Sequence, residues 1–163
     1  MANSKQAHLD SIQSIKSEFL AVLEGMAYCL DWKQDESEWS ARELVYHMLD
    51  SPPGGAQNLV KGIISGDVQE YEIWSDLTNI TPERAAFDIG QVNADITTFF
   101  GSLSNSISGL TDGDLEQKKA TMYQRTRGSE EERTLNAILE RTLNGHIKEH
   151  LIQLRTIREA LAI

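Results

Sequence analysis

The chain has 163 residues, and its 15 Lys and Arg against 25 Asp and Glu give a formal net charge of -10. This length suits one domain with a continuous hydrophobic core, so we expect residues 1–163 to form a single domain. An acidic chain repels phosphate backbones and anionic lipids, which argues against nucleic acid and membranes as partners.

Signals for export or disulfide chemistry are missing from the sequence. It begins Met-Ala-Asn-Ser-Lys-Gln, without the apolar run of a signal peptide, and it contains no stretch of about 18 apolar residues. We therefore expect a cytoplasmic protein. Its single cysteine, Cys29, cannot form an internal disulfide, and we interpret it as a small apolar residue late in a helix.

Apolar residues at three- and four-residue spacing predict four helices along the chain. The first predicted helix covers residues 5–30. Its apolar stripe consists of Leu9, Ile12, Ile15, Phe19, Val22, Leu23, Met26 and Leu30.

The second predicted helix has the clearest start signal in the sequence. Ser40 can cap the free amides of the first turn, and Glu43, three residues later, can complete a capping box. Trp39 can pack against Leu44 across the start of the helix. The second helix is therefore predicted to begin at Ser40.

The remainder of this segment is predicted to be interrupted. Pro52-Pro53-Gly54-Gly55 should break or kink the helix, because prolines lack an amide donor and glycines are flexible. A further helical piece should run to about Ser65, and residues 66–80 should form a long crossing connection.

The third and fourth helices are predicted from their caps. Thr81-Pro82 places a cap before a proline at the first helical position, and Gly109 is the expected end of the third helix. Residues 110–128 are polar and expected to be irregular, with one short helical turn at most. Ser129-Glu130-Glu131-Glu132 matches a capping box and predicts the start of a fourth helix that runs nearly to the carboxyl terminus. Since no segment alternates with the period of a strand, the predicted fold is an all-α four-helix bundle.

Two histidines stand within the predicted buried stripe of the fourth helix, at places where the pattern calls for leucine. His146 and His150 are four residues apart, so their side chains share one face and can converge on one point. A buried imidazole needs partners for two ring nitrogens, and a metal ion can satisfy one nitrogen of each ring. His47 lies in a similar apolar stripe of the second helix. If the two helices are antiparallel, the rise of about 1.5 Å per residue puts all three imidazoles at one level.

Other interpretations of these residues remain open. The three histidines can all be structural, bonded to backbone carbonyls or water. His146-Ile147-Lys148-Glu149-His150 also fits an inverted zincin string, with Glu149 as general base, but the chain after His150 is too short for that much larger family. Glu43 can approach a metal on His47, although capping already explains it. His8 is placed outside this geometry and expected to be a solvated surface residue, and the aromatic side chains are interpreted as packing residues: Trp32, Trp39, Tyr71 and Trp74.

Together these residues resemble the DinB/YfiT-like superfamily of small metalloproteins. The resemblance rests on Trp39-Ser40-x-x-Glu43-x-x-x-His47 and His146-x-x-x-His150-x-x-Gln153, and in helix order it extends over essentially the whole chain. It implies an up-down-down-up bundle with a long connection between helices two and three. It also implies a nickel, zinc or similar divalent ion on His47, His146 and His150. The Pro52–Gly55 interruption departs from the usual continuous second helix.

The function expected from this site is metal-dependent chemistry on a small molecule. Three neutral imidazoles leave open positions on a divalent ion, as in catalytic sites, where bound water or a thiol is activated. By the resemblance, the activity would be that of a thiol-dependent S-transferase, with a low-molecular-weight thiol as cosubstrate, or of a hydrolase. Gln153 and Glu149 are expected near the ligands, and no catalytic side chain is assigned. The alternative is a non-catalytic binding or regulatory module, with or without metal, that acts as a homodimer.

Overall fold

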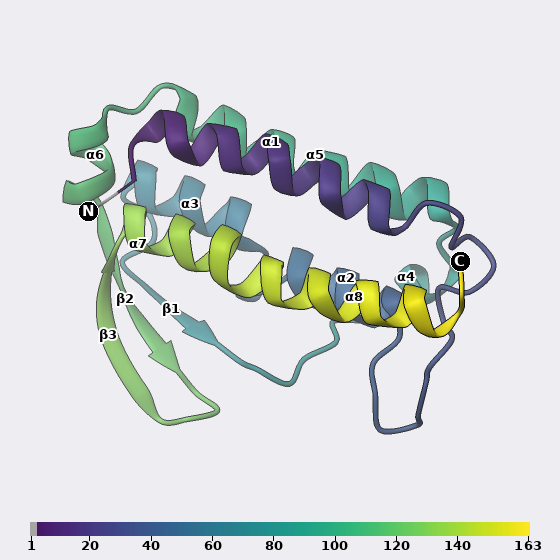
Figure 1. Ribbon diagram of the computed structural model, residues 1–163. Coiled ribbons are helices and arrows are strands. Elements are labelled where there is room, and N and C mark those ends of the chain that lie inside the picture. Colours follow the sequence, from purple (N-terminus) through teal and green to yellow (C-terminus); the bar gives the residue numbers. More distant parts are fainter. Residues whose placement is uncertain (1–2) are drawn as a thin grey trace.

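The computed structural model describes residues 3–163, and four long helical segments form its body (Figure 1). The first segment is α1 (Lys5–Val22). The second consists of α2 (Ala41–Leu49) and α3 (Ala56–Ser65), and the third is α5 (Ile89–Ser108). The fourth consists of α7 (Leu135–Glu140), the π-helical turn η1 (Arg141–Ile147) and α8 (Lys148–Ala160). The first and fourth segments run one way and the second and third run the other, the up-down-down-up order (Figure 1).

The first helix is shorter than predicted. It starts after Ser4, whose side chain accepts from the Ala7 amide, and it ends at Val22 rather than near residue 30. The following turns nevertheless keep Leu23, Met26 and Leu30 buried. The apolar spacing therefore identified core residues correctly but did not show where the helical hydrogen bonds stop.

The second segment begins as predicted, because both hydrogen bonds of the Ser40–Glu43 capping box are present. It is interrupted at the predicted place, and α3 starts again after Gly55. At Gly55 the backbone has φ of +87°, and an added Cβ would lie 2.7 Å from the Leu49 carbonyl oxygen. Only glycine fits this position without a shift of the backbone.

The crossing between α3 and α5 carries a strand and a short helix, β1 (Glu70–Ile73) and α4 (Pro82–Ala86). Thr81 caps α4 as predicted, but α4 is not the start of the long third helix. Arg42 donates to the carbonyl oxygens of Arg84 and Phe87 and so satisfies the end of α4. A second cap, Asp88, then begins α5, which ends at Gly109 as predicted.

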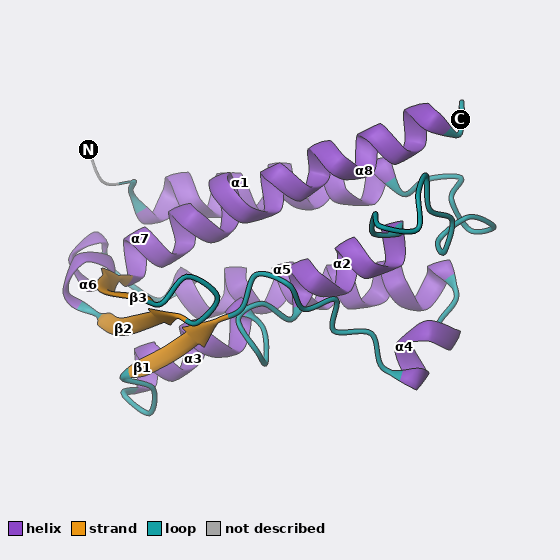
Figure 2. Cartoon of the chain, turned by 90° about the horizontal axis from the view of Figure 1, so that it is seen from below, coloured by secondary structure: helices purple, strands orange, loops and turns teal. Residues whose placement is uncertain are grey.

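The prediction of a purely helical fold was wrong, because a small mixed sheet covers one end of the bundle (Figure 2). After α6 (Asp112–Gln117) come β2 (Lys119–Gln124) and β3 (Ser129–Thr134), which are antiparallel, while β1 is parallel to β2. Residues 110–128 are thus partly ordered as a strand, and Ser129–Glu132 is strand rather than a helix cap. Thr134 is the actual cap of α7.

A local physical reason explains this error. Gly128 turns the hairpin with φ of +72°, and the acidic side chains of β3 remain exposed. One of them, Glu132, pairs with Lys119 on β2 at 3.0 Å. Exposed acids suit a helix start and the outer face of a hairpin equally well, so their spacing alone did not distinguish the two.

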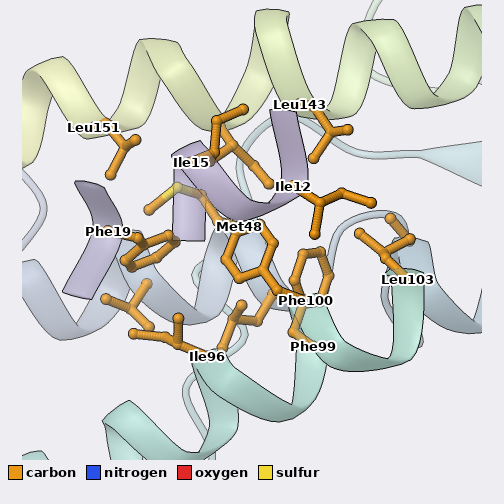
Figure 3. Close-up of a cluster of buried hydrophobic side chains, with 14 of the residues drawn as sticks. Ile12, Ile15, Phe19, Met48, Ile96, Phe99, Phe100, Leu103, Leu143 and Leu151 are labelled. Carbon is orange, nitrogen blue, oxygen red and sulfur yellow. The ribbon is translucent and has the colours of Figure 1, made fainter. Parts of the chain in front are cut away.

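Side chains from all four segments meet in one hydrophobic core (Figure 3). In the middle of the fourth segment, however, the buried face lies one residue beyond His146 and His150, which were predicted to be buried, whereas Leu139 and Leu154 on either side are buried as the apolar spacing indicates. Leu143, Ile147 and Leu151 are buried, whereas Thr142, His146 and His150 are half-buried beside them. The i→i+5 bonding of η1 widens the turn and changes the register of this face. Within residues 3–163, no helix combines the length and apolarity that a bilayer crossing requires.

Candidate metal centre

The structure brings His47, His146 and His150 together, and we call them the three-histidine cluster. His47 comes from α2, His146 from the end of η1 and His150 from the first turns of α8. One nitrogen from each ring lies within 4.8 Å of the other two, and the three ring centroids are 4.7 to 4.9 Å apart. The predicted convergence of two antiparallel helices at one level is therefore present in the fold (Figure 1).

The hydrogen bonds of His47 fix which nitrogen faces the cluster. Its Nδ1 lies 2.5 Å from the carbonyl oxygen of Leu77, which can only accept, so Nδ1 carries the proton. The neutral ring then has a lone pair on Nε2, which lies 2.9 Å from Nε2 of His146. Two lone pairs at this distance would repel each other. The contact therefore requires either the tautomer of His146 that carries its proton on Nε2 and donates it to His47, or a cation between the rings.

The remaining ligand is oriented by its own helix. Nδ1 of His150 lies 2.5 Å from Oε1 of Gln153, one turn further along α8, which leaves Nε2 of His150 free for the cluster. Gln153 therefore contacts a histidine of the cluster. The Glu149 side chain is exposed, and no hydrogen bond joins it to a histidine among residues 3–163.

Burial keeps the rings of His47 and His146 neutral. Desolvation lowers the pKa of His146 to about 3, with smaller contributions from His150 and His47. Desolvation also lowers the pKa of His47, opposed by its bond to Leu77 and assisted by His150. A neutral imidazole is the form that binds a metal ion, so the surroundings of the cluster favour ligand chemistry over protonation.

Trp39 and an adjoining pocket form the boundary of the cluster. The Trp39 ring meets His47 edge-on at 4.8 Å between centroids and lies roughly parallel to His150 at 6.5 Å. Trp39 also lines a pocket of about 380 Å³, together with His150 and Gln153. A small molecule in this pocket would touch the one histidine of the cluster that faces it.

The donor set fits a divalent cation. Zinc with three nitrogen ligands at about 2.0–2.1 Å places those nitrogens roughly 3.4 Å apart. The observed separations, 2.9 Å between two Nε2 atoms and at most 4.8 Å overall, lie on either side of this value. Small rotations of the rings would bring the three nitrogens into place. Two of the rings already donate their other nitrogen to an oxygen, as metal-bound histidines usually do.

Two features of the site were missed by sequence reasoning. Leu77 contributes a backbone carbonyl from the crossing segment, and no side-chain pattern reports such a contact. Trp39 was interpreted as a packing residue, yet its ring contacts the cluster. Its position eight residues before His47 was the available signal. The expectation for His8 was wrong in the opposite sense, because that side chain is fully buried.

Fold and site together define a mostly helical bundle protein with a three-histidine cluster on two antiparallel segments, open to a pocket. Among solved structures, YfiT from Bacillus subtilis is similar, with a TM-score of 0.74 and 16% identity over 97% of this chain and 87% of YfiT. YfiT is described as a probable metal-dependent hydrolase with an unusual four-helix bundle topology. At this identity the likeness shows the fold alone, and this fold is the one that the resemblance to the DinB/YfiT-like superfamily implied.

Two further structures share this fold. A Streptococcus pneumoniae protein matches with a TM-score of 0.69 and 13% identity over 98% of this chain and 92% of its own. A protein from Clostridium difficile 630 matches with a TM-score of 0.65 and 12% identity over 98% of both chains. No family model matches the sequence. No curated protein matches it either.

Proposed function

We propose that the protein is a metal-dependent enzyme that binds a divalent ion, zinc or nickel, on His47, His146 and His150 and activates water or a thiol toward a small electrophile. The observation that carries the proposal is the pair of Nε2 atoms 2.9 Å apart, one of which has a lone pair fixed by the Leu77 carbonyl. A cation between the rings resolves this contact and uses the third histidine as well. The likeness to YfiT, a probable metal-dependent hydrolase, supports the hydrolase form, and the superfamily resemblance supports the thiol form.

A divalent ion on three neutral imidazoles supplies Lewis-acid chemistry, since it lowers the pKa of water or of a thiol in its open position. The protein's own residues hold the ligands in place. Leu77 keeps the proton of His47 on Nδ1, and Gln153 keeps that of His150 on Nδ1. Trp39 shields one side of the rings from water, and the pocket beside it positions the substrate next to His150.

Metal content of protein purified without a histidine tag tests the first half of the proposal. We expect close to one divalent ion per chain, lost in His146→Ala and in His150→Ala. Lys148→Ala is the matched control, because Lys148 is exposed on the same stretch of helix and outside the cluster. Equal metal content in all three variants would contradict the site.

Turnover tests the second half. The loaded protein is assayed with neutral 4-nitrophenyl esters, and with a thiol plus an electrophile, before and after chelation. We expect turnover that chelation abolishes and that added zinc or nickel restores. Stoichiometric metal without metal-dependent turnover in either assay would favour a non-catalytic binding or regulatory module instead.

A further inference from the structure

The pocket beside the cluster has an uneven charge distribution that bears on the substrate. Glu38 is the only carboxylate among its lining residues, and among the described residues no Lys or Arg lines it. Apart from His150, the other lining groups are uncharged: amides, hydroxyls, two aliphatic side chains and the Trp39 ring. In the metal-free pocket, neutral and cationic molecules can therefore enter without leaving a charge unpaired, whereas an anionic group would face a carboxylate with no side-chain cation to offset it.

Three cations close in sequence to this pocket are paired with other acids. Lys33, on the loop before α2, pairs with Glu43 at 3.0 Å, and Arg42, in the first turn of α2, pairs with Asp31 at 2.7 Å. On α8, Arg155 pairs with Glu18 of α1 at 2.8 Å. None of them is free to neutralise Glu38, and the salt bridges of residues 3–163 include none to Glu38.

The loop fixes the backbone of Glu38, whose side chain is exposed. Its amide donates to the Asp35 carbonyl at 3.0 Å, and the Asp35 side chain accepts from the amide and hydroxyl of Ser37 at 2.9 and 2.8 Å. This turn delivers Glu38 and Trp39, in succession, to the pocket. A carboxylate next to an indole ring is the pair of groups that binds an organic ammonium, through charge and through the face of the ring.

From this arrangement we propose that the pocket selects a small molecule with an apolar body and a positively charged amino group, and that Glu38 and Trp39 bind the ammonium. The inference rests on the proposed function, since it identifies the substrate class of that site. Leu44 and Ile157 would contact the apolar body.

Three probes of one shape and different charge test the selectivity: 3-phenylpropylamine, 3-phenylpropanol and 3-phenylpropanoate. Their dissociation constants are measured at pH 7.5 on the full-length protein freed of metal, by NMR titration of the tryptophan indole signals. We expect the amine to bind about tenfold more tightly than the carboxylate, with the alcohol between them. Equal binding, tighter binding of the carboxylate, or no saturable binding of the amine at millimolar concentration would overturn the inference.

Two variants and one matched control assign the effect to Glu38. Glu38→Gln should reduce the preference for the amine to about threefold or less, and Glu38→Lys should reverse it in favour of the carboxylate. Glu36→Gln makes the same change in net charge two residues away, at an exposed acid outside the pocket lining, and should leave the preference unchanged. An equal effect of Glu36→Gln would show a bulk charge effect and contradict the role of Glu38.

The metal-free measurement separates this inference from the proposed function. If the metal analysis fails, an amine preference that depends on Glu38 still identifies an ammonium-binding pocket, and the enzyme proposal alone is lost. If metal and turnover are found but the probes show no charge preference, the substrate class alone is wrong.

Discussion

Two histidine sites of the bundle, the single residue His8 and the three-histidine cluster, differ in what their ring nitrogens face. His8 on α1 is fully buried, and its Nε2 bonds Oδ1 of Asn136 at 2.8 Å. The Asn136 amide is itself fixed, because its Nδ2 donates to Asn3 and Glu116. In the three-histidine cluster, by contrast, the imidazoles face one another.

The difference shows how burial alone fails to indicate function. His8 links two helices through the bond from its Nε2 to an amide oxygen, while its buried Nδ1 has no hydrogen-bond partner among the described residues. Histidines whose free nitrogens converge cannot satisfy one another as lone pairs, so they call for a proton or a cation. Variants that affect one site and spare the other test this distinction.

The largest effect is expected from His8→Ala. It leaves a cavity and removes the partner of Asn136, and should lower the free energy of unfolding by about 3 kcal/mol. Chemical denaturation measures this, with Gln6→Ala as an exposed control on the same helix, expected to change stability by less than about 0.5 kcal/mol. The stabilisation that added zinc provides should be the same as in the wild type. Loss of that stabilisation in His8→Ala would mean that the two sites are not independent.

Zinc should stabilise the folded chain only through the cluster. At a free concentration of about 100 times the dissociation constant, the gain is about 2.7 kcal/mol, which raises Tm by roughly 5–10 °C. Differential scanning calorimetry with and without zinc measures it. His47→Ala should abolish the shift, and a full shift in that variant would contradict the assignment of His47 as a ligand.

Acid should weaken the metal-free protein through the same rings. The pKa values of His47 and His146 are lowered in the folded state, so below about pH 6.5 the unfolded chain binds more protons than the native chain. The free energy of unfolding should therefore fall as pH drops below 6.5, by on the order of 2 kcal/mol at pH 4.5, and these rings should cause no change above pH 7. Denaturation curves across this range, compared with His146→Ala, measure the contribution. An identical pH dependence in the variant would refute it.

The smallest effect is expected from the residue that orients His150. Gln153→Ala removes the acceptor of the Nδ1 proton and should weaken zinc binding about tenfold, with little change in the stability of the metal-free protein. Gln153→Glu keeps an oxygen at this position and should retain most of the affinity. Competition with a chromogenic chelator measures both. If the two variants bind zinc equally, the hydrogen bond does not matter to the site.

Much of the helical framework was predictable, because it depends on local chemistry. The Ser40–Glu43 capping box, the break before Gly55 and the end at Gly109 are each decided by a few adjacent residues. The sheet was missed for the complementary reason. Ser129–Glu132 carries the residues of a helix start. Its backbone hydrogen bonds to β2, which the local spacing of side chains does not report, make it a strand instead.

The sequence by itself determined which residue types could meet: His146 and His150 share a helix face because they are four apart, and His47 follows a well-defined cap. Only the tertiary structure decided the rest. The turn η1 moves both histidines beside the buried face instead of into it, the Leu77 carbonyl fixes the His47 proton, and His8 is buried by Asn136 from the far end of the chain. The first depends on a change of helical register, and the other two depend on partners at least 30 residues away, one of them a backbone carbonyl. The spacing of side chains along one helix does not predict any of these features.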